Sequence, residues 1–412
     1  MHILSRVALV AAATLSVAAH AEPLTLEDAI ARALSVAPEA QVNKARLEAL
    51  RAARGQAGLK PNPSIEVVGE NFAGTGPYLV DRAEITASYA QSLERGSKRE
   101  ARVALAERDI DIAAAEANVQ RLDIIALVQR GYVEVMAAEA ALENAEHRLV
   151  VARGLARETD RRVKAAKDPL FAGTRAQTMV AEANVEVDLT KHARDAALTR
   201  LTALWNGKPD GLEVPAGTFL RFDRPEQAAA PSAPDLAVHE ARTRRADAAV
   251  TLEEARRVQD PTVRGGLRYL RETNDVALMA GVSIPLARRE ANRLNVERAS
   301  AERAQAAANA EVARVLRMRE LRLAEEKVTE ARHEAEAVRD DVIPGLEKTL
   351  AQVFQGYARG GFSYNDVVQA QTALANARAR LVSAASEYHS AGVELDRLTA
   401  RFANPLPQEE TR

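Results

Sequence analysis

The sequence contains no cysteine, and this absence removes several classes of function. A chain without thiols has no disulfide framework, no thiolate metal ligand and no cysteine nucleophile. It also lacks the cysteine that a bacterial lipoprotein carries as its first mature residue. We therefore expect a protein without a lipid anchor.

Aromatic residues are also scarce, and the net charge is close to zero. Aromatics make up 4% of the chain, and its formal net charge is −2. Without a basic excess to neutralise phosphates, we expect no nucleic-acid partner. Alanine, by contrast, supplies roughly a fifth of the residues, far above ordinary usage. Because alanine is the best helix former and its small side chain allows close packing, the composition predicts a mostly helical protein.

Long hydrophobic runs are absent from the rest of the chain after the amino terminus. No apolar run there approaches the length of about 18 residues that is typical of a membrane-spanning helix. The amino terminus carries Arg6, an apolar run over 7–18, and the small residues Ala19 and Ala21. This is the pattern of a secretory signal peptide that is cleaved after Ala21. We predict a signal peptide over 1–21, with a buried amino-terminal helix as the alternative interpretation.

The chain repeats one order of elements, and each half closes with the same residues, Arg-Leu-Thr-Ala, at 200–203 and 397–400. Each half is predicted to form a helix, a strand pair, a long helix and a shorter helix. The first repeat covers 22–205, with strands at 64–71 and 83–93 and helices at 98–166 and 169–204. The second covers 235–402, with strands at 262–270 and 276–286 and helices at 289–357 and 363–401. A linker rich in proline, glycine and alanine, 206–234, joins the repeats, and 403–412 forms a carboxy-terminal tail.

The predicted long helices exceed what a compact domain accommodates. Residues 98–166 contain no proline, and at about 1.5 Å per residue a helix of this length spans on the order of 100 Å. Apolar residues recur every three or four positions, which is typical of a coiled-coil-like assembly. In the second half Pro344 interrupts the long helix, so we expect a kink there.

The strands alternate apolar and polar residues with the period of two that a two-faced sheet requires. Ile85 faces the side opposite Glu84, and Leu267 faces the side opposite Arg264 and Arg268. Strands of about ten residues cross a bilayer when they are tilted. Because arginine on a lipid face is costly, we predict that Glu84, Arg264 and Arg268 face the wet lumen of a barrel. A soluble, half-buried sheet shows the same alternation and is the alternative.

Four strands are too few to close a barrel, since about eight is the smallest number known. Open sheet edges are not tolerated in lipid, so each chain must share its barrel with other copies. Three copies supply about twelve strands, an even number within the known range. The sequence therefore predicts a chain that is mainly α with a small membrane β part and an internal two-fold repeat. Its long helical hairpins and four strands would form a homotrimer, a trimeric α/β barrel.

A series of short motifs follows a fixed order along the chain. They are Thr-Leu-Glu-Asp-Ala at 25–29, Pro38-Glu39, Asn62-Pro63, Lys98-Arg99, Ile284-Pro285-Leu286 and the run 356–371. Together they resemble the TolC-type outer-membrane factors over essentially the whole predicted mature chain. Residues 201–206 are similar to the end of the first repeat in the cobalt–zinc–cadmium efflux subgroup of that family.

The resemblance implies a passive exit duct for a tripartite efflux system. Its strands would lie in outer-membrane lipid, and its helical barrel would extend into the periplasm. Its tips would dock onto a periplasmic adaptor (membrane fusion) protein and an inner-membrane RND pump. The pump would supply the energy, so the duct needs no cofactor. The subgroup implies heavy-metal cations as cargo, with drugs or other small solutes as the alternative.

The resemblance implies functional roles for two sets of residues, one at the periplasmic aperture and one at the docking tips. Asp366 matches the first acidic residue of the family's Asp-x-x-Asp run at the periplasmic aperture, and the second position is Gln369 here. A first-turn acid that stabilises its own helix is the alternative for Asp366. The turns between paired helices are implied to be the docking tips, with plain connecting turns as the alternative. Their residues are Lys167, Asp168, Pro169, Gly360, Gly361, Phe362 and Ser363.

No residue pattern for catalysis or metal binding is evident. The histidines after the predicted signal peptide are scattered, without the spacing of a metal site. Nucleotide-binding loops, serine-triad motifs and His-Glu-x-x-His are absent from the sequence. We therefore predict a non-enzyme without a metal site. The main rival is a periplasmic adaptor or another coiled-coil component of an efflux or secretion system, but an adaptor would carry one helical hairpin, not two. A cytoplasmic scaffold would carry no signal peptide.

Overall fold

The computed structural model of the chain describes residues 22–72, 82–223, 233–286 and 292–402. Within them the fold is mostly helical, with one four-stranded sheet and one pair of very short strands. The predicted signal peptide, with Ala19 and Ala21, and the predicted tail at 403–412 lie outside the described residues. Among the described helices, none has both the length and the hydropathy needed to cross a membrane.

The described residues form two compact units, and neither coincides with one half of the sequence. Unit 1 contains the described part of Met1–Ala33, with Val128–Asp223 and Thr329–Ser390. Unit 2 contains the described residues of Leu34–Leu127, Arg224–Val328 and Ala391–Arg412. Each unit combines residues from both predicted repeats, because helices from the two repeats pack against each other within it. The helices that contribute to both units are α1 (Leu26–Val36), α3 (Lys98–Lys164), α6 (Arg293–Ala337) and α8 (Tyr364–Leu398).

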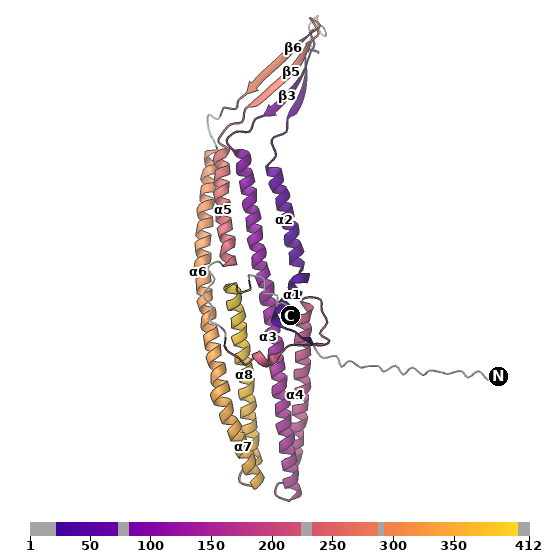
Figure 1. The fold of residues 1–412 in the computed structure, drawn as a ribbon, viewed down its shortest axis with the longest axis vertical. Helices are drawn as coiled ribbons and strands as arrows, with labels where there is room; N and C mark the ends of the chain where they lie inside the picture. Colours follow the sequence, from indigo (N-terminus) through magenta and orange to yellow (C-terminus); the bar gives the residue numbers. More distant parts are fainter. Residues whose placement is uncertain (1–21, 73–81, 224–232, 287–291, 403–412) are drawn as a thin grey trace, which may run out of the picture. The chain divides into compact units, whose positions relative to one another are not determined.

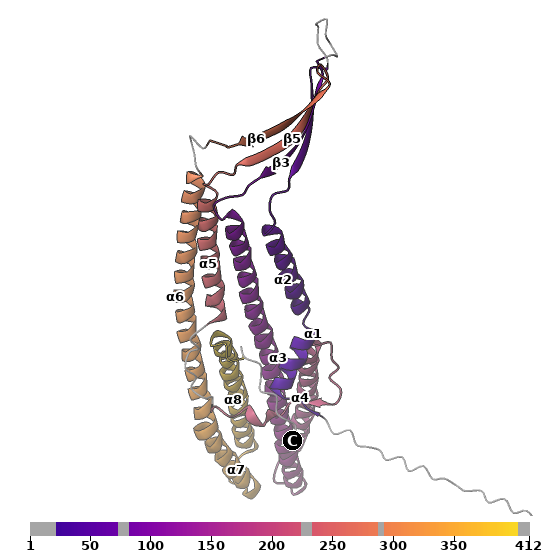
Figure 2. The same cartoon turned by 45° about the horizontal axis from the view of Figure 1, so that its top comes forward.

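Unit 2 joins helices to an antiparallel sheet (Figure 1). The strands are β2 (Ser64–Glu70), β3 (Glu84–Ser92), β5 (Thr262–Leu270) and β6 (Asp275–Ser283), in the order β2-β3-β5-β6. Strands β3 and β5 join the two predicted repeats, and in their register Thr86 lies opposite Arg268. In Figure 2 the labelled strands β3, β5 and β6 again lie side by side.

The helices that lead into the sheet begin with proline. They are α2 (Pro38–Ala57) and α5 (Pro234–Ala255), and each has proline in its first turn. The first backbone N–H groups of a helix have no intrahelical partner, so proline loses nothing there and supplies a preformed φ angle. This explains why Pro38 and Pro234 start helices although proline breaks them elsewhere.

Unit 1 contains two helical hairpins. The first pairs α3 with α4 (Leu170–Ala203), and the second pairs α7 (Ile343–Arg359) with α8. Helix α3 runs for 67 residues without interruption. Between α3 and α4 alanine supplies part of the buried contact, as in the cluster of Leu149, Ala152 and Ala183. Alanine therefore sets a narrow contact between long helices, as the composition predicts.

The second long helix changes its winding just before Pro344. A π-helical turn, η2 (Val338–Val342), lies between α6 and α7. Proline has no N–H for the carbonyl one turn earlier, and a wider turn accommodates the missing hydrogen bond. Arg339 on this turn donates to the Leu220 carbonyl at 2.9 Å, and its guanidinium lies over the Phe222 ring. The predicted interruption thus takes the form of a π-helical turn that holds the segment after α4.

The amino-terminal segment is fastened to unit 1 by contacts that no sequence pattern indicates. Strand β1 (Glu22–Pro23) pairs in parallel with β4 (Leu212–Glu213), which is followed by the 3-10 helix η1 (Ala216–Thr218). Leu24 is fully buried, and the Tyr132 hydroxyl donates to its carbonyl at 2.9 Å. Burial raises the pKa of Tyr132 to about 12, so the hydroxyl keeps its proton at physiological pH.

Replacing Tyr132 by phenylalanine tests this attachment. The Leu24 carbonyl would lose its donor in a buried position, which costs about 1–3 kcal/mol. We expect Tyr132→Phe to lower the free energy of unfolding by that amount in urea denaturation followed by circular dichroism. Tyr89→Phe removes an exposed hydroxyl and is the matched control. Equal midpoints for the Tyr132 variant and the wild type would contradict this role.

Candidate functional site

One face of the sheet carries a ladder of ion pairs. Arg268 reaches Glu84 at 3.1 Å and Glu70 at 3.6 Å, and its Nε donates to the Thr86 hydroxyl at 3.0 Å. Arg264 reaches Glu66 at 3.3 Å. The structure thus places the predicted lumen residues Glu84, Arg264 and Arg268 on a common polar face. Both arginines start on β5 and reach carboxylates on β2, across the intervening strand β3.

Two carboxylates of this ladder were missed by sequence reasoning. A strand over 64–71 is predicted from the sequence, but neither Glu66 nor Glu70 is assigned to a face. Its alternation with Ile65 and Val67 was the signal that would have placed both acids on the polar face. The strand is regular over Ser64–Glu70 and pairs with β3 throughout.

The opposite face of the sheet is apolar and uncovered. Leu278 is 85% exposed and Ile65 is 79% exposed, which is far from the burial of a core residue. The same face carries further exposed apolar side chains from all four strands, namely Val67, Ile85, Tyr89, Val263, Leu267, Tyr269, Val276 and Val282. A continuous apolar surface of this kind marks contact with a partner or a membrane.

The turn between α3 and α4 is tightly built. Ala166 adopts a left-handed conformation with φ of 57°, and the Lys167 N–H donates back to the Arg162 carbonyl at 2.9 Å. Pro169 precedes the first residue of α4 in an extended conformation. These contacts satisfy carbonyls at the end of α3 and reverse the chain within a few residues.

The turn between α7 and α8 uses glycine for the same purpose. Gly360 has φ of 87°, a conformation that glycine adopts without strain, and the Gly361 N–H donates to the Gly356 carbonyl at 2.8 Å. The Phe362 ring packs directly on Gly356, where an added Cβ would lie 2.0 Å from a ring carbon. The absence of a side chain at Gly356 therefore leaves room for the Phe362 ring, and this packing fixes the shape of the turn.

The two turns of unit 1 are joined by a polar network, which we call the tip network. It consists of Thr159, Arg162, Asp168 and Tyr357. Both Asp168 oxygens accept from Arg162, at 2.9 and 3.0 Å, and the Tyr357 hydroxyl donates to Asp168 at 2.6 Å. Arg162 also donates to the Tyr357 carbonyl at 2.7 Å, and its guanidinium lies 4.5 Å from the centre of the Tyr357 ring. The hydroxyls of Thr159 and Tyr357 are 3.1 Å apart.

The tip network sits on a small apolar cluster and is largely removed from water. Leu155, Tyr357 and Val367 form this cluster and are each at most 1% exposed. The side chains of Arg162 and Asp168 are 11% and 14% exposed. A bidentate pair in such a place is stronger than an exposed pair, and removing one partner leaves the other charge uncompensated.

The network also sets the ionisation of its members. The hydrogen bonds from Arg162, with a further one from Tyr357, hold the pKa of Asp168 below its usual value despite burial. Burial and the hydrogen bond to Asp168 raise the pKa of Tyr357 to about 12. At neutral pH Asp168 is therefore an anion, and Tyr357 is a donor to it. Of these four residues only Asp168 was predicted from the sequence, because the others become neighbours only in the folded protein.

Asp366 lies in the first turn of α8 and forms a reciprocal cap with Ser363. The Ser363 N–H and hydroxyl donate to the Asp366 carboxylate at 2.8 and 2.7 Å, and the Asp366 N–H lies 3.3 Å from the Ser363 hydroxyl. This is a capping box, and its hydrogen bonds hold the pKa of Asp366 below its usual value. Gln369 follows one turn later and is exposed.

The tips also present apolar side chains to solvent. Phe362 is 49% exposed, whereas Leu170 and Phe171 at the start of α4 are 82% and 70% exposed. Leu170 and Phe171 were missed by sequence reasoning, although two large apolar residues directly after Pro169 were a readable signal. Lys167 lies beside them in the turn and is exposed.

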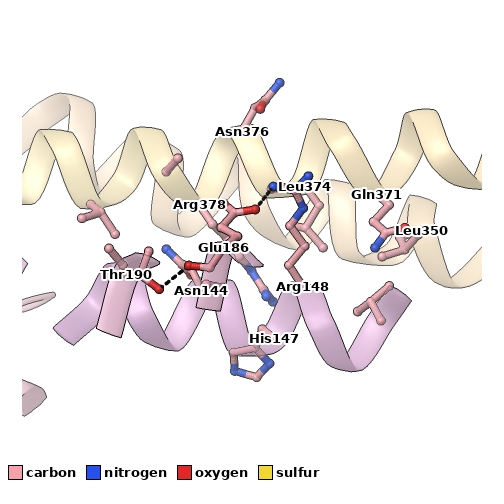
Figure 3. Close-up of a pocket in the computed structure, with 16 residues that line it drawn as sticks. Asn144, His147, Arg148, Glu186, Thr190, Leu350, Gln371, Leu374, Asn376 and Arg378 are labelled. Carbon is pink, nitrogen blue, oxygen red and sulfur yellow. Dashed lines mark hydrogen bonds and ion pairs between the residues drawn. The ribbon is translucent and has the colours of Figure 1, made fainter. Parts of the chain in front are cut away.

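A groove of about 280 Å³ lies between the two hairpins of unit 1, away from the turns (Figure 3). Its walls carry the ion pair of Arg148 with Glu186, and Arg378 of the same groove pairs with Glu347 at 2.7 Å. Gln371 faces the groove from α8, and its Oε1 is buried without a hydrogen-bond partner among the described residues. Within the same residues no group of three or more histidines, cysteines and carboxylates is arranged to hold a metal ion.

Comparison with known proteins gives a consistent result. The family model described as outer membrane efflux protein matches residues 29–207 and 226–401. The chain is 28% identical to the cobalt-zinc-cadmium resistance protein CzcC of Cupriavidus metallidurans, over 92% of this chain and 91% of that protein. It is 28% identical to the nickel-cobalt-cadmium resistance protein NccC of Alcaligenes xylosoxydans xylosoxydans, over 70% of this chain and 67% of that protein.

Solved structures share the fold. The outer membrane protein VceC from Vibrio cholerae superposes with a TM-score of 0.72 at 20% identity, covering 91% of this chain and 95% of that chain. A crystal structure of CusC gives a TM-score of 0.70 at 15% identity, covering 91% of each chain. At this level of identity, the likeness concerns the fold.

The tip network predicts an acid-sensitive contact between the hairpins. Because the folded state lowers the pKa of Asp168, the stabilisation is present above the ordinary aspartate pKa of about 3.9 and is lost as the pH falls through the lowered value. We expect the Lys167 and Gly361 amides to be protected at neutral pH, relative to the intrinsic exchange rate at that pH, and to lose this protection in strong acid. Asp168→Asn should lack the protection at both pH values, as measured by hydrogen exchange with mass spectrometry.

Asp160→Asn is the matched control for this measurement. Asp160 lies near the end of α3 and pairs with the exposed Lys164 at 2.7 Å. Slow exchange at neutral pH in the Asp168 variant, equal to that of the control, would show that the ion pair does not hold the tips.

Proposed function

This chain belongs to the outer membrane efflux protein family, and from that premise we propose that it is the passive exit duct of a tripartite efflux system. The duct leads solutes from the periplasm through the outer membrane and performs no chemistry on them. An inner-membrane RND pump supplies the energy, and a periplasmic adaptor connects the pump to the duct.

The observation that carries this proposal is the two-faced sheet of unit 2. Its apolar face is exposed on all four strands, and its polar face holds ion pairs in which every charged partner lies on one side. A lipid environment on one side and water on the other explain both faces. Arg264, Arg268 and Glu84 then line the lumen, together with Glu66 and Glu70.

The sheet needs other copies of the chain to close. Among the described strands, β2 and β6 each pair on one side only, so both outer edges present unsatisfied backbone groups. Such edges are not tolerated in lipid. Sheets of three chains supply about twelve strands, which is within the range of known closed sheets. A homotrimer is therefore the proposed assembly, and its helices would extend into the periplasm.

The tip network is the proposed latch of the periplasmic aperture. It binds the α7–α8 turn to the α3–α4 turn through Arg162, Asp168 and Tyr357. In a threefold assembly Asp366 would repeat as a ring of carboxylates, which favours cations over anions. Gln369 at the second position keeps that ring less acidic than a double ring of aspartates. Capping and ring formation are compatible, because Ser363 uses only part of the acceptor capacity of the carboxylate.

The exposed tip residues are the proposed docking surface for the adaptor and the pump. Leu170, Phe171 and Phe362 supply apolar contact, and Lys167 supplies charge, while Gly360 and Gly361 keep the turn narrow. Exposed aromatic and aliphatic side chains on a fixed backbone are the usual anchors of a protein interface. Asp168, Pro169 and Ser363 contribute by fixing the two turns.

Heavy-metal cations are the proposed cargo. The support is the printed names of the relatives, which are resistance proteins for cobalt, zinc, cadmium and nickel. A duct that only conducts has no need to bind its cargo tightly, so selection among metals would belong to the pump. A weak preference for cations at the Asp366 ring suits such cargo.

Ion selectivity in a planar lipid bilayer tests the duct and its aperture together. We expect the purified wild type to conduct and to prefer cations. Asp366→Asn keeps a capping oxygen but removes the charge, so it should lower the cation-to-anion permeability ratio roughly twofold or more. Asp188→Asn removes an exposed charge of α4 and should leave the ratio unchanged. Reversal potentials in a salt gradient give the ratio.

Each outcome decides a different part of the proposal. Conductance with an unchanged ratio in Asp366→Asn would leave the duct in place and reduce Asp366 to a capping residue. Absence of conductance from correctly folded wild-type protein would contradict the duct itself.

A further inference from the structure

Short segments connect the helices of unit 2 to the strands (Figure 1). These segments carry basic side chains near apolar ones. Three of these segments form one surface, namely the segment between α2 and β2, the one between β3 and α3, and the one between α5 and β5. We call it the junction surface, and it consists of Leu59, Lys60, Leu93, Arg95, Arg257 and Val258.

Hydrogen bonds hold the three segments together. Arg102 donates to the carbonyls of Ala57 and Leu59, each at 3.2 Å, and forms an ion pair with Glu94. The Leu93 N–H donates to the Pro261 carbonyl at 2.8 Å. These contacts fix the segments relative to one another, so their side chains form one surface within unit 2.

Asp260 also connects the segment before β5 to the segment between β3 and α3. One of its oxygens accepts from the Arg95 N–H at 2.9 Å, and the other pairs with Lys98 at 2.7 Å. The carboxylates at the junction are thus neutralised by their own partners, since Glu94 pairs with Arg102 and Glu100 pairs with Arg99. Glu254 in the last turn of α5 forms no ion pair among the described residues, so it offsets one positive charge at this level.

Three cations of the junction surface outnumber that one acid. Lys60, Arg95 and Arg257 are exposed, and among the residues that the structure describes none of their side chains forms an ion pair. The surface therefore carries a net positive charge and attracts anions.

Each of these cations has an exposed apolar neighbour along the chain. Leu59 is 58% exposed, Leu93 is 44% exposed and Val258 is 38% exposed. Apolar side chains next to basic ones are typical of the boundary between hydrocarbon and headgroups, where the aliphatic part meets acyl chains and the charge meets phosphate. The surface also adjoins the exposed apolar face of the sheet, so the two form a continuous boundary.

A hollow next to Lys60 offers room for a headgroup. It has a volume of about 720 Å³ and lies between the segments 60–63 and 91–100. Asn62 and Gln91 in its lining offer hydrogen bonds. The lining also includes Glu94 and Glu100, which are paired with Arg102 and Arg99.

We propose that the junction surface binds the phosphate groups of membrane phospholipids through Lys60, Arg95 and Arg257, and favours headgroups with a net negative charge. The proposal rests on the proposed function in one respect, because the sheet must lie in the outer membrane for the surface to meet its periplasmic leaflet. Bound phospholipid would then hold the sheet at a fixed depth in the bilayer.

Lipid binding to the full-length purified protein tests the proposal. The probe is phosphatidylglycerol added to detergent-solubilised protein, with phosphatidylethanolamine as the zwitterionic comparison and native mass spectrometry as the readout. We expect phosphatidylglycerol to be retained more strongly than phosphatidylethanolamine. The triple variant Lys60→Gln, Arg95→Gln, Arg257→Gln should bind phosphatidylglycerol roughly tenfold or more weakly, since each cation near an anionic surface contributes a several-fold factor. The difference should shrink at high salt.

A control with the same change of charge makes the result specific. Lys191→Gln, Lys327→Gln, Lys348→Gln removes three exposed cations elsewhere and should bind phosphatidylglycerol like the wild type. Equal losses in both triple variants would overturn the proposal in favour of general charge attraction. Equal retention by the junction variant and the wild type would also overturn it. Displacement of the lipid by millimolar inorganic phosphate would show a free-anion site instead.

Two further measurements keep the outcomes separable. Arg95→Gln alone should give a partial loss, which guards against a triple variant that folds poorly. Conductance of the same preparations separates this inference from the proposed function. A junction variant that conducts but has lost no lipid preference contradicts only the inference, whereas a wild type that never conducts contradicts the duct.

Discussion

The ion pair of Arg162 with Asp168 on the α3–α4 hairpin holds Tyr357 of the α7–α8 hairpin, and the arrangement of the two hairpins depends on this contact. Long helices that meet through alanine bury little surface per residue, so the packing along them leaves the turns weakly held. At the turns the chain adds the tip network over a small apolar cluster, and Arg175 of α4 donates to the Asn365 side chain of α8 at 2.9 Å. Removing one partner of such a pair costs on the order of 3 kcal/mol.

The sheet obeys a second constraint, which is that each of its faces must meet a different medium. Arginine side chains from β5 reach acids on β2 only because β3 presents small or polar residues between them, such as Ser88 and Ala90. The opposite face contributes only apolar or small groups along most of its length. The apolar face is exposed in the single chain, so a half-buried sheet would need a partner to cover it. The family match spans both halves of the chain, so the outer-membrane interpretation is confirmed over the adaptor.

The sequence predicted the parts of the fold that depend on local periodicity. The long helix after Lys98, the four strands and the polar side of Arg264 and Arg268 follow from spacing alone, and the structure has them. Contacts between segments distant in the chain carried no such signal. Which helices pack together decides the hydrogen bond between Tyr132 and the Leu24 carbonyl. It also decides the partners of Asp168 and the division into two units. The acids of β2 were missed for another reason, since their alternation with Ile65 and Val67 was a local signal from which no face was assigned.

Single-channel conductance of Asp168→Asn beside the wild type tests the central claim, that the tip network closes the periplasmic end of the duct. The variant loses the anion that Arg162 and Tyr357 hold, while its size and the fold of the sheet are kept. The account predicts a larger unitary conductance in the variant, with the wild type opening to that level only in strong acid. Equal unitary conductance of the two proteins at neutral pH would contradict it.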